Sequence, residues 1–200
     1  MAGYGLRPYM GKAFGQAYNA GGFTEYPIDV DVSGTPDCFT GDFMTLTSTG
    51  EVTRTNGTAG ATPVAGTPTI GVAVGFRYVD SDGDIKWSQR YVGNANNTEA
   101  YAFIVVDPNA AFIIQADAAV TQASVGARAP VVNFIGSSAS TITGNSGMQL
   151  DASEIAAPGS TLALQIIAIP QDGSNENSTT PNVIVRLTPG VHQANIPAGV

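Results

Sequence analysis

Short runs of β-forming residues, separated by turns rich in glycine, proline, asparagine and aspartate, recur along this sequence from Ile28 to Leu187. Where a period is visible it is the two-residue alternation of a strand, and the runs are too short for self-stable helices. Many short strands with regular turn signals are typical of β-sandwiches and small barrels. We therefore predict an all-β protein with one jelly-roll-like sandwich or barrel domain (28–188), an extended N-terminal arm (1–27) and an irregular C-terminal tail (189–200).

The clearest predicted hairpin spans residues 70–92. Small and large residues alternate over 70–79, a polar Asp-Ser-Asp-Gly-Asp stretch follows, and the second strand begins at residue 85. Asp-Gly is typical of a tight turn between two strands. Alternation places Ile85, Trp87, Gln89 and Tyr91 on one face of the second strand.

The rest of the domain follows the same pattern. A second hairpin is predicted from 43–47 and 51–55 around the turn Ser-Thr-Gly, and residues 58–68 form a loop rich in small residues. The segments best suited to a single helical turn are 117–122 and 152–156. Further strands are predicted at 101–106, 112–115, 131–134, 162–169 and 183–187.

Charged residues are scarce. They make up 12% of the chain, with only eight Lys plus Arg, against roughly 25% in an average soluble protein. Surfaces poor in charge are typical of faces that lie against other proteins, although Thr, Ser and Asn can also keep a β-protein soluble. The net charge of −8 argues against nucleic-acid binding, which needs clustered Lys and Arg. We expect no secretory signal and no membrane span, since no apolar run approaches about 20 residues.

The first 27 residues differ from the rest of the chain. They contain four of the seven tyrosines, interrupted by glycines and prolines that fit neither a helix nor a strand period. Aromatic side chains are preferred anchors at protein interfaces, so we predict an arm that binds a neighbouring subunit; an arm that wraps its own domain, or is disordered, is the alternative. The predicted interface residues of arm and tail are Tyr4, Arg7, Tyr9, Phe14, Tyr18, Phe23, Tyr26, His192, Gln193 and Ile196.

No residue pattern indicates catalysis or a bound cofactor. Asp80, Asp82 and Asp84 resemble a calcium loop, but position 12 counted from Asp80 is Tyr91 rather than glutamate and both flanks are strands, so a plain turn is favoured. Cys38 is the only cysteine and is expected to be buried and inert. His192 is the only histidine, and one His with one Cys makes neither a zinc site nor a triad. We therefore expect a protein that is not an enzyme.

A series of motifs resembles a known family, the small accessory head proteins of tailed bacteriophages, called decoration or cement proteins. The series covers most of the chain as loose patterns: an aromatic Gly/Pro-rich start, then residues 41–44, 71–78, 87–89, 101–109, 112–117, 143–146, 150–151, 191–193 and 199–200. The resemblance implies a non-enzymatic virion protein that is made in the host cytoplasm and binds the outside of the mature capsid. It also implies a dimer or trimer that bridges and stabilises neighbouring copies of the major capsid protein.

Three other classes of function stay open at this point. The first is a carbohydrate- or receptor-binding β-sandwich of a phage tail or fibre, for which Trp87 and Tyr91 would supply an aromatic platform, although residues of this kind are more often buried in a core. The second is an unrecognised hydrolase. The third is a major coat subunit, which the absence of long predicted helices disfavours.

Overall fold

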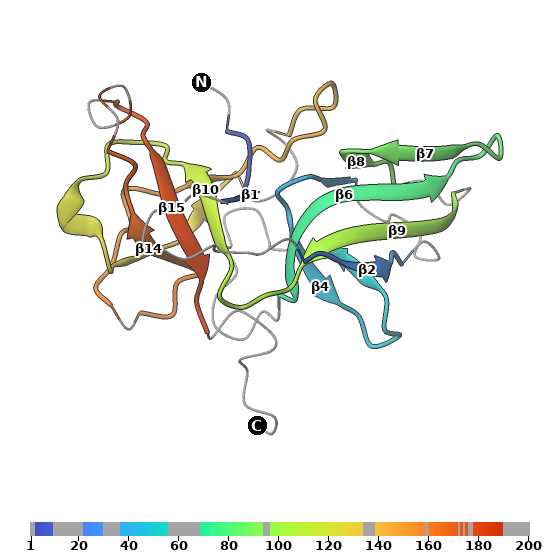
Figure 1. Ribbon diagram of the computed structural model, residues 1–200, viewed down its shortest axis with the longest axis horizontal. Helices are drawn as coiled ribbons and strands as arrows, with labels where there is room; N and C mark the ends of the chain where they lie inside the picture. Colours follow the sequence, from blue (N-terminus) through green and yellow to red (C-terminus); the bar gives the residue numbers. More distant parts are fainter. Residues whose placement is uncertain are drawn as a thin grey trace.

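The computed structural model describes residues 3–9, 22–29, 37–55, 69–93, 97–133, 139–158, 160–171, 173, 175 and 178–189. Regular structure in these residues is almost entirely β, with one 3₁₀ turn, η1 (Gln122–Ser124). The predicted all-β fold is therefore confirmed. The strands form two main sheets that lie side by side (Figure 1), and the described strands do not close into a barrel.

The first main sheet has five strands in the order β1–β10–β15–β14–β11, and every neighbouring pair is antiparallel. Its strands are β1 (Arg7–Pro8), β10 (Ala111–Gln115), β15 (Asn182–Leu187), β14 (Leu164–Ala168) and β11 (Arg128–Ala129). Alternating residues of β10 and β15 pack inward, and their β-branched and aromatic side chains suit a pleated, half-buried surface.

The second main sheet has six strands, β2–β9–β6–β4–β5 with β7 paired to β6. Its strands are β2 (Thr24–Pro27), β9 (Thr98–Val105), β6 (Gly71–Val79), β4 (Phe43–Leu46), β5 (Val52–Arg54) and β7 (Ile85–Ser88). Two small ladders complete the fold: β3 (Cys38–Phe39) with β8 (Arg90–Tyr91), and β12 (Val131–Val132) with β13 (Gln149–Leu150).

Both predicted hairpins are present, as β4–β5 and β6–β7. The connection between β6 and β7 is held by Asp80, whose carboxylate accepts the backbone N–H groups of Asp82 and Asp84 at 3.0 Å. Gly83 takes a left-handed φ of 87°, which costs glycine little. The helical turn predicted at 117–122 is not found; the 3₁₀ turn begins only at Gln122, and 152–156 holds no helix. The loop predicted at 58–68 lies outside the described residues.

The second strand of the long hairpin is interrupted, which corrects one prediction. β7 ends at Ser88 and β8 begins at Arg90, so the chain bends at Gln89. Trp87 is 71% exposed whereas Tyr91 is fully buried. The two aromatic residues that alternation placed on one face therefore lie in different environments, and Trp87 is not a core residue.

Two hydrophobic clusters form the core. One lies against the five-stranded sheet and the other within the six-stranded sheet and its β3–β8 flank. Successive residues of three strands divide between them. Phe43, Val72 and Val105 belong to the first cluster, and their neighbours Met44, Ala73 and Ile104 belong to the second. Because side chains alternate across a strand, this part of the sheet contacts one core with each face.

Candidate functional site

The described parts of the predicted arm are strands of the chain's own sheets. β1 pairs with β10, and β2 pairs with β9. The Tyr4 hydroxyl donates to Asn182 Oδ1 at 2.6 Å, and the Arg7 guanidinium lies 4.5 Å from the Tyr4 ring centroid. Burial raises the pKa of Tyr4, and the charge of Arg7 partly opposes this. Over residues 3–9 and 22–27, the segment predicted as an arm is therefore part of the β fold.

The other predicted interface residues have different positions. Tyr9 is half-buried beside β10, and its N–H donates to the carbonyl of Ala111 at 2.8 Å. Tyr26 packs against the second core cluster, whereas Phe23 is 59% exposed. The remaining ones lie outside the described residues: Phe14, Tyr18, His192, Gln193 and Ile196.

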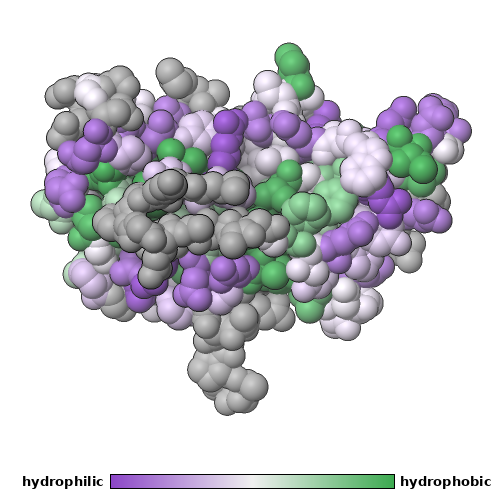
Figure 2. Space-filling view, viewed as in Figure 1, coloured by the Kyte–Doolittle hydropathy of each residue, from purple (hydrophilic) through white to green (hydrophobic). Residues whose placement is uncertain are grey.

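Phe23 belongs to a surface group of three aromatic rings that sequence reasoning missed. Its ring meets that of Phe103 edge-on at 5.2 Å, and Phe103 stacks on Trp87 at 5.6 Å with 7° between the ring planes. We call these three residues the aromatic face. Figure 2 shows hydrophobic residues at the molecular surface over the six-stranded sheet.

The aromatic face depends on Gly75. β6 lies between β7 and β9, so the rings of Trp87 and Phe103 must meet above β6. Gly75 is the residue of β6 paired with Phe103, and a Cβ built there would already be in van der Waals contact, 3.5 Å from the Phe103 ring. Because glycine has no side chain, the space above β6 stays open for the two rings.

Charged groups border the aromatic face. Arg77, the partner of Trp87 in the β6–β7 register, forms an ion pair with Glu25 at 3.3 Å. Its guanidinium also lies 4.5 Å from the Tyr101 ring centroid. This surface therefore offers flat apolar rings beside a paired cation and carboxylate.

A hollow of about 370 Å³ adjoins Trp87. It is bordered by Gln89 and Val92 after β7 and by the loop around Thr141, Ile142 and Thr143. Ile142 is 95% exposed at that loop. The hollow thus combines hydroxyl and amide groups with exposed apolar side chains.

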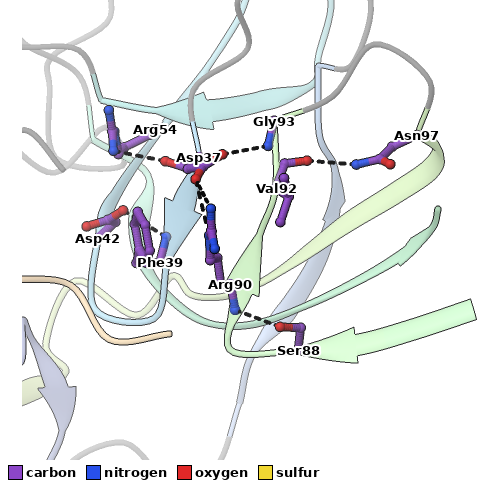
Figure 3. A network of polar contacts seen from close by, with 9 residues as sticks. All are labelled: Asp37, Phe39, Asp42, Arg54, Ser88, Arg90, Val92, Gly93 and Asn97. Atoms are coloured by element: carbon purple, nitrogen blue, oxygen red, sulfur yellow. Dashed lines mark hydrogen bonds and ion pairs between the residues drawn. The ribbon is translucent and has the colours of Figure 1, made fainter. Parts of the chain in front are cut away.

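A polar network fixes the chain after β7 (Figure 3). The Asp37 carboxylate accepts two N–H groups from the Arg90 guanidinium and the N–H of Gly93, the latter at 2.9 Å. The Asp37 carbonyl accepts Arg54 Nη1 at 2.9 Å. Hydrogen bonds between charged groups are stronger than neutral ones, so these contacts tie β8 and Gly93 to the residue that precedes β3.

A buried polar group lies beneath this network. The Asp42 carboxylate accepts the N–H of Phe39 at 2.9 Å and is also bonded by Ser146, and burial raises its pKa to about 6. Burial, followed by the nearby Asp42 charge, raises the pKa of the Cys38 thiol to about 12. Cys38 is fully buried, as predicted, and its thiol stays protonated.

A larger cavity of about 590 Å³ lies over the five-stranded sheet, between the Val125–Gly126 turn and strands β14 and β15. Arg186 borders it and donates from Nε to Gln165 Oε1 at 2.8 Å. The described residues contain no group of His, Cys, Asp or Glu arranged to hold a metal ion. Lys86 of β7 forms ion pairs with both Asp80 and Asp84 of the preceding loop.

Comparisons with protein-family models, with curated proteins and with solved structures found no match. None of the described helices is long and apolar enough to cross a membrane.

Proposed function

We propose that this chain is a non-enzymatic virion structural protein that binds the outside of a phage capsid and bridges neighbouring capsid subunits. The partner is the major capsid protein. The family resemblance supports this reading, and the surface around β7 supports it independently because it is suited to contact with another protein.

One observation carries the proposal. The large hydrophobic side chains that are exposed in the described part of the chain are Phe23, Ile85, Trp87, Val92 and Ile142. Ile85 and Trp87 are on β7, and Val92 and Ile142 border the hollow beside Trp87. Phe23 joins this group because its ring contacts Phe103, which stacks on Trp87. Exposed apolar residues that gather in one place mark interaction sites, whereas scattered ones need no explanation.

The physical basis is the desolvation of aromatic rings at a partner surface. Aromatic residues dominate the binding energy of protein interfaces, and each copy on a symmetric shell meets an equivalent site. Contacts to two or more subunits then act together, so the complex is tighter than any single contact. Within the predicted arm, Phe23 is the described residue best placed for this role.

The test uses phage heads that lack the protein. Purified wild-type protein is added and the heads are imaged by electron microscopy, with a variant carrying Phe23→Ser and Trp87→Ala in parallel. Ordered extra density with wild type, lost in the double variant, is the expected result. Glu154→Ala, at an exposed position between β13 and β14, is the control and is expected to bind. Heads that acquire no ordered density would overturn the proposal.

A second candidate is glycan binding, and the exposure of Trp87 favours it. One face of the indole stacks on Phe103. The hollow beside Trp87 supplies the Gln89 amide and the hydroxyls of Thr141 and Thr143. The C–H face of a sugar ring packs on an aromatic ring while its hydroxyls need hydrogen-bond partners, so this combination suits a saccharide. Glycan binding that Trp87→Ala abolishes in a folded protein would favour this function over capsid attachment.

A further inference from the structure

The cavity of about 590 Å³ over the five-stranded sheet has two polar side chains in its wall, those of Gln165 and Arg186. They are cross-strand partners of β14 and β15. Their chain neighbours Leu164, Ile166 and Val185 belong to the first hydrophobic cluster. Because side chains alternate across a strand, Gln165 and Arg186 lie on the face of the sheet that is turned away from this cluster.

Gln165 holds the Arg186 guanidinium by one edge. Its Oε1 accepts the Nε–H of Arg186 at 2.8 Å, and its Nε2 donates to the carbonyl of Gly126 at 3.4 Å. Since the amide nitrogen is engaged with Gly126, the oxygen is the end that faces Arg186. The guanidinium is thus fixed through Nε, and none of the described residues accepts a hydrogen bond from its two Nη groups.

The charge of Arg186 has no carboxylate partner in the described part of the chain. The described residues that line the cavity include neither Asp nor Glu. Asp107 is two residues from Asn109, which lines the cavity, but its carboxylate accepts the N–H of Asn109 at 2.8 Å within its own turn. Cations elsewhere in the described structure do form ion pairs: Arg77, Lys86 and Arg90. The wall of this cavity therefore presents a positive charge that the described residues do not neutralise.

Arg128 brings a second positive charge to the same row. It is the partner of Gln165 on the other side, in β11, so the three residues Arg128, Gln165 and Arg186 lie side by side across three strands. Strands are spaced about 4.8 Å apart, which puts the two arginine backbones about 10 Å from each other. Nη1 of Arg128 donates to the carbonyl of Ser160 rather than to a carboxylate. Both arginines therefore make the potential at this end of the sheet more positive.

We propose that this cavity binds a small organic carboxylate. Arg186 binds the carboxylate group through its Nη groups, and Val125 and Ile167, which also line the cavity, contact the apolar part of the ligand. The two oxygens of a carboxylate match the parallel N–H groups of a guanidinium. The volume lies within the range of about 300–1,000 Å³ that is typical of small-molecule sites, which combine apolar walls with a few fixed polar groups.

The surroundings favour a carboxylate over inorganic phosphate. Phosphate sites commonly use free backbone N–H groups of a loop or a helix start, whereas the N–H of Gly126 donates to the carbonyl of Ile166 at 2.9 Å. The net charge of −8 opposes a dianion more strongly than a monoanion. Phosphate also has no apolar part to contact Val125 and Ile167. The inference does not depend on capsid attachment, because the aromatic face belongs to the other main sheet.

The first experiment titrates the full chain, labelled with nitrogen-15, with four probes in a chloride buffer and follows the amide resonances. Benzoate and hexanoate are the carboxylates, benzamide is the neutral control and inorganic phosphate is the apolar-free anion. Saturable shifts of the Gly126 and Asn109 amides are expected with the carboxylates, with binding at least about tenfold weaker for benzamide and phosphate. The proposal is wrong if neither carboxylate gives saturable shifts, or if benzamide or phosphate binds as tightly.

The second experiment assigns the binding to Arg186. Arg186→Gln keeps an amide beside Gln165 and is expected to raise the carboxylate dissociation constant at least about tenfold. Lys86→Gln makes the same charge change on the other main sheet and is expected to bind as wild type does.

A further variant covers the case in which Arg186→Gln does not fold. Asn109→Asp changes an exposed residue of the cavity lining into a carboxylate, which competes for Arg186 and repels the ligand. If Arg186→Gln loses its β-sheet circular dichroism, Asn109→Asp decides. Carboxylate binding that no folded variant of the two weakens would overturn the proposal. Because Lys86→Gln and Asn109→Asp leave the aromatic face unchanged, the capsid-binding test is decided separately.

Discussion

The buried carboxyl of Asp42 should make the protein less stable at neutral pH than a variant in which it cannot ionise. The pKa of Asp42 rises from 3.8 to about 6 in the folded protein, chiefly through burial. Below pH 3.8 the carboxyl is protonated in both states and costs nothing. Between pH 3.8 and about 6 the unfolded chain loses this proton while the folded chain keeps it, so stability falls over this range and stays lower above it.

The size of the effect follows from the same values. One pKa unit corresponds to about 1.4 kcal/mol, so a rise from 3.8 to about 6 costs about 3 kcal/mol of unfolding free energy once both states are ionised. Asp42→Asn removes the titration and keeps an oxygen to accept the Phe39 N–H, while its amide can donate to Ser146. We expect the free energy of unfolding of the variant to gain about 3 kcal/mol relative to wild type as the pH rises from 3.8 to about 6, and to keep this advantage at neutral pH.

The assay is urea unfolding of both proteins at a series of pH values, followed by far-ultraviolet circular dichroism. The other carboxyls titrate in both proteins and cancel in the difference. The control is Asp107→Asn, which changes a carboxylate of an exposed turn. The reasoning is refuted if the difference in free energy of unfolding between Asp42→Asn and wild type does not change with pH. It is also refuted if wild type becomes more stable relative to the variant as the pH rises.

Three further predictions concern the surface and the polar network. Gly75→Val should separate the stacked rings, changing the fluorescence of Trp87, the only tryptophan, with little change in circular dichroism; unchanged emission would contradict the ring geometry. Asp37→Ala should lower the free energy of unfolding by about 1–2 kcal/mol, measured in urea, because Arg90 loses a charged partner; Asp37 has no role if stability is unchanged. Cys38 should react with a thiol reagent only in denaturant, and rapid reaction of the native protein would show that the thiol is accessible.

The hairpins were predictable because local chemistry specifies them. Alternation over β6 and the Asp-Gly pair at Asp82–Gly83 act over a few neighbouring residues, so the sequence pattern contains the information. β1 and β3 have only two residues each, which is too short for any period to be read. Their pairing depends on strands distant in the chain, and no local signal reports it.

The aromatic face was not predictable for a related reason. Phe23, Trp87 and Phe103 are far apart in the chain, and Gly75 leaves the space above β6 open where the rings of Trp87 and Phe103 meet. The bend at Gln89 also breaks the two-residue alternation, so the exposed Trp87 and the buried Tyr91 do not share one face of a strand as predicted. A glycine inside an otherwise regular strand was the one available hint, since such glycines often mark close approach of other groups.

Strands β4, β6 and β9 have a mechanical consequence through the two cores that they touch. Phe43 and Met44 are adjacent in the chain but belong to different hydrophobic clusters, as do Val72 and Ala73. The same stretch of backbone therefore borders both hydrophobic clusters. A force applied to the residues around one cluster passes to the other along covalent strands rather than across a flexible hinge, so the molecule should resist bending between the two clusters.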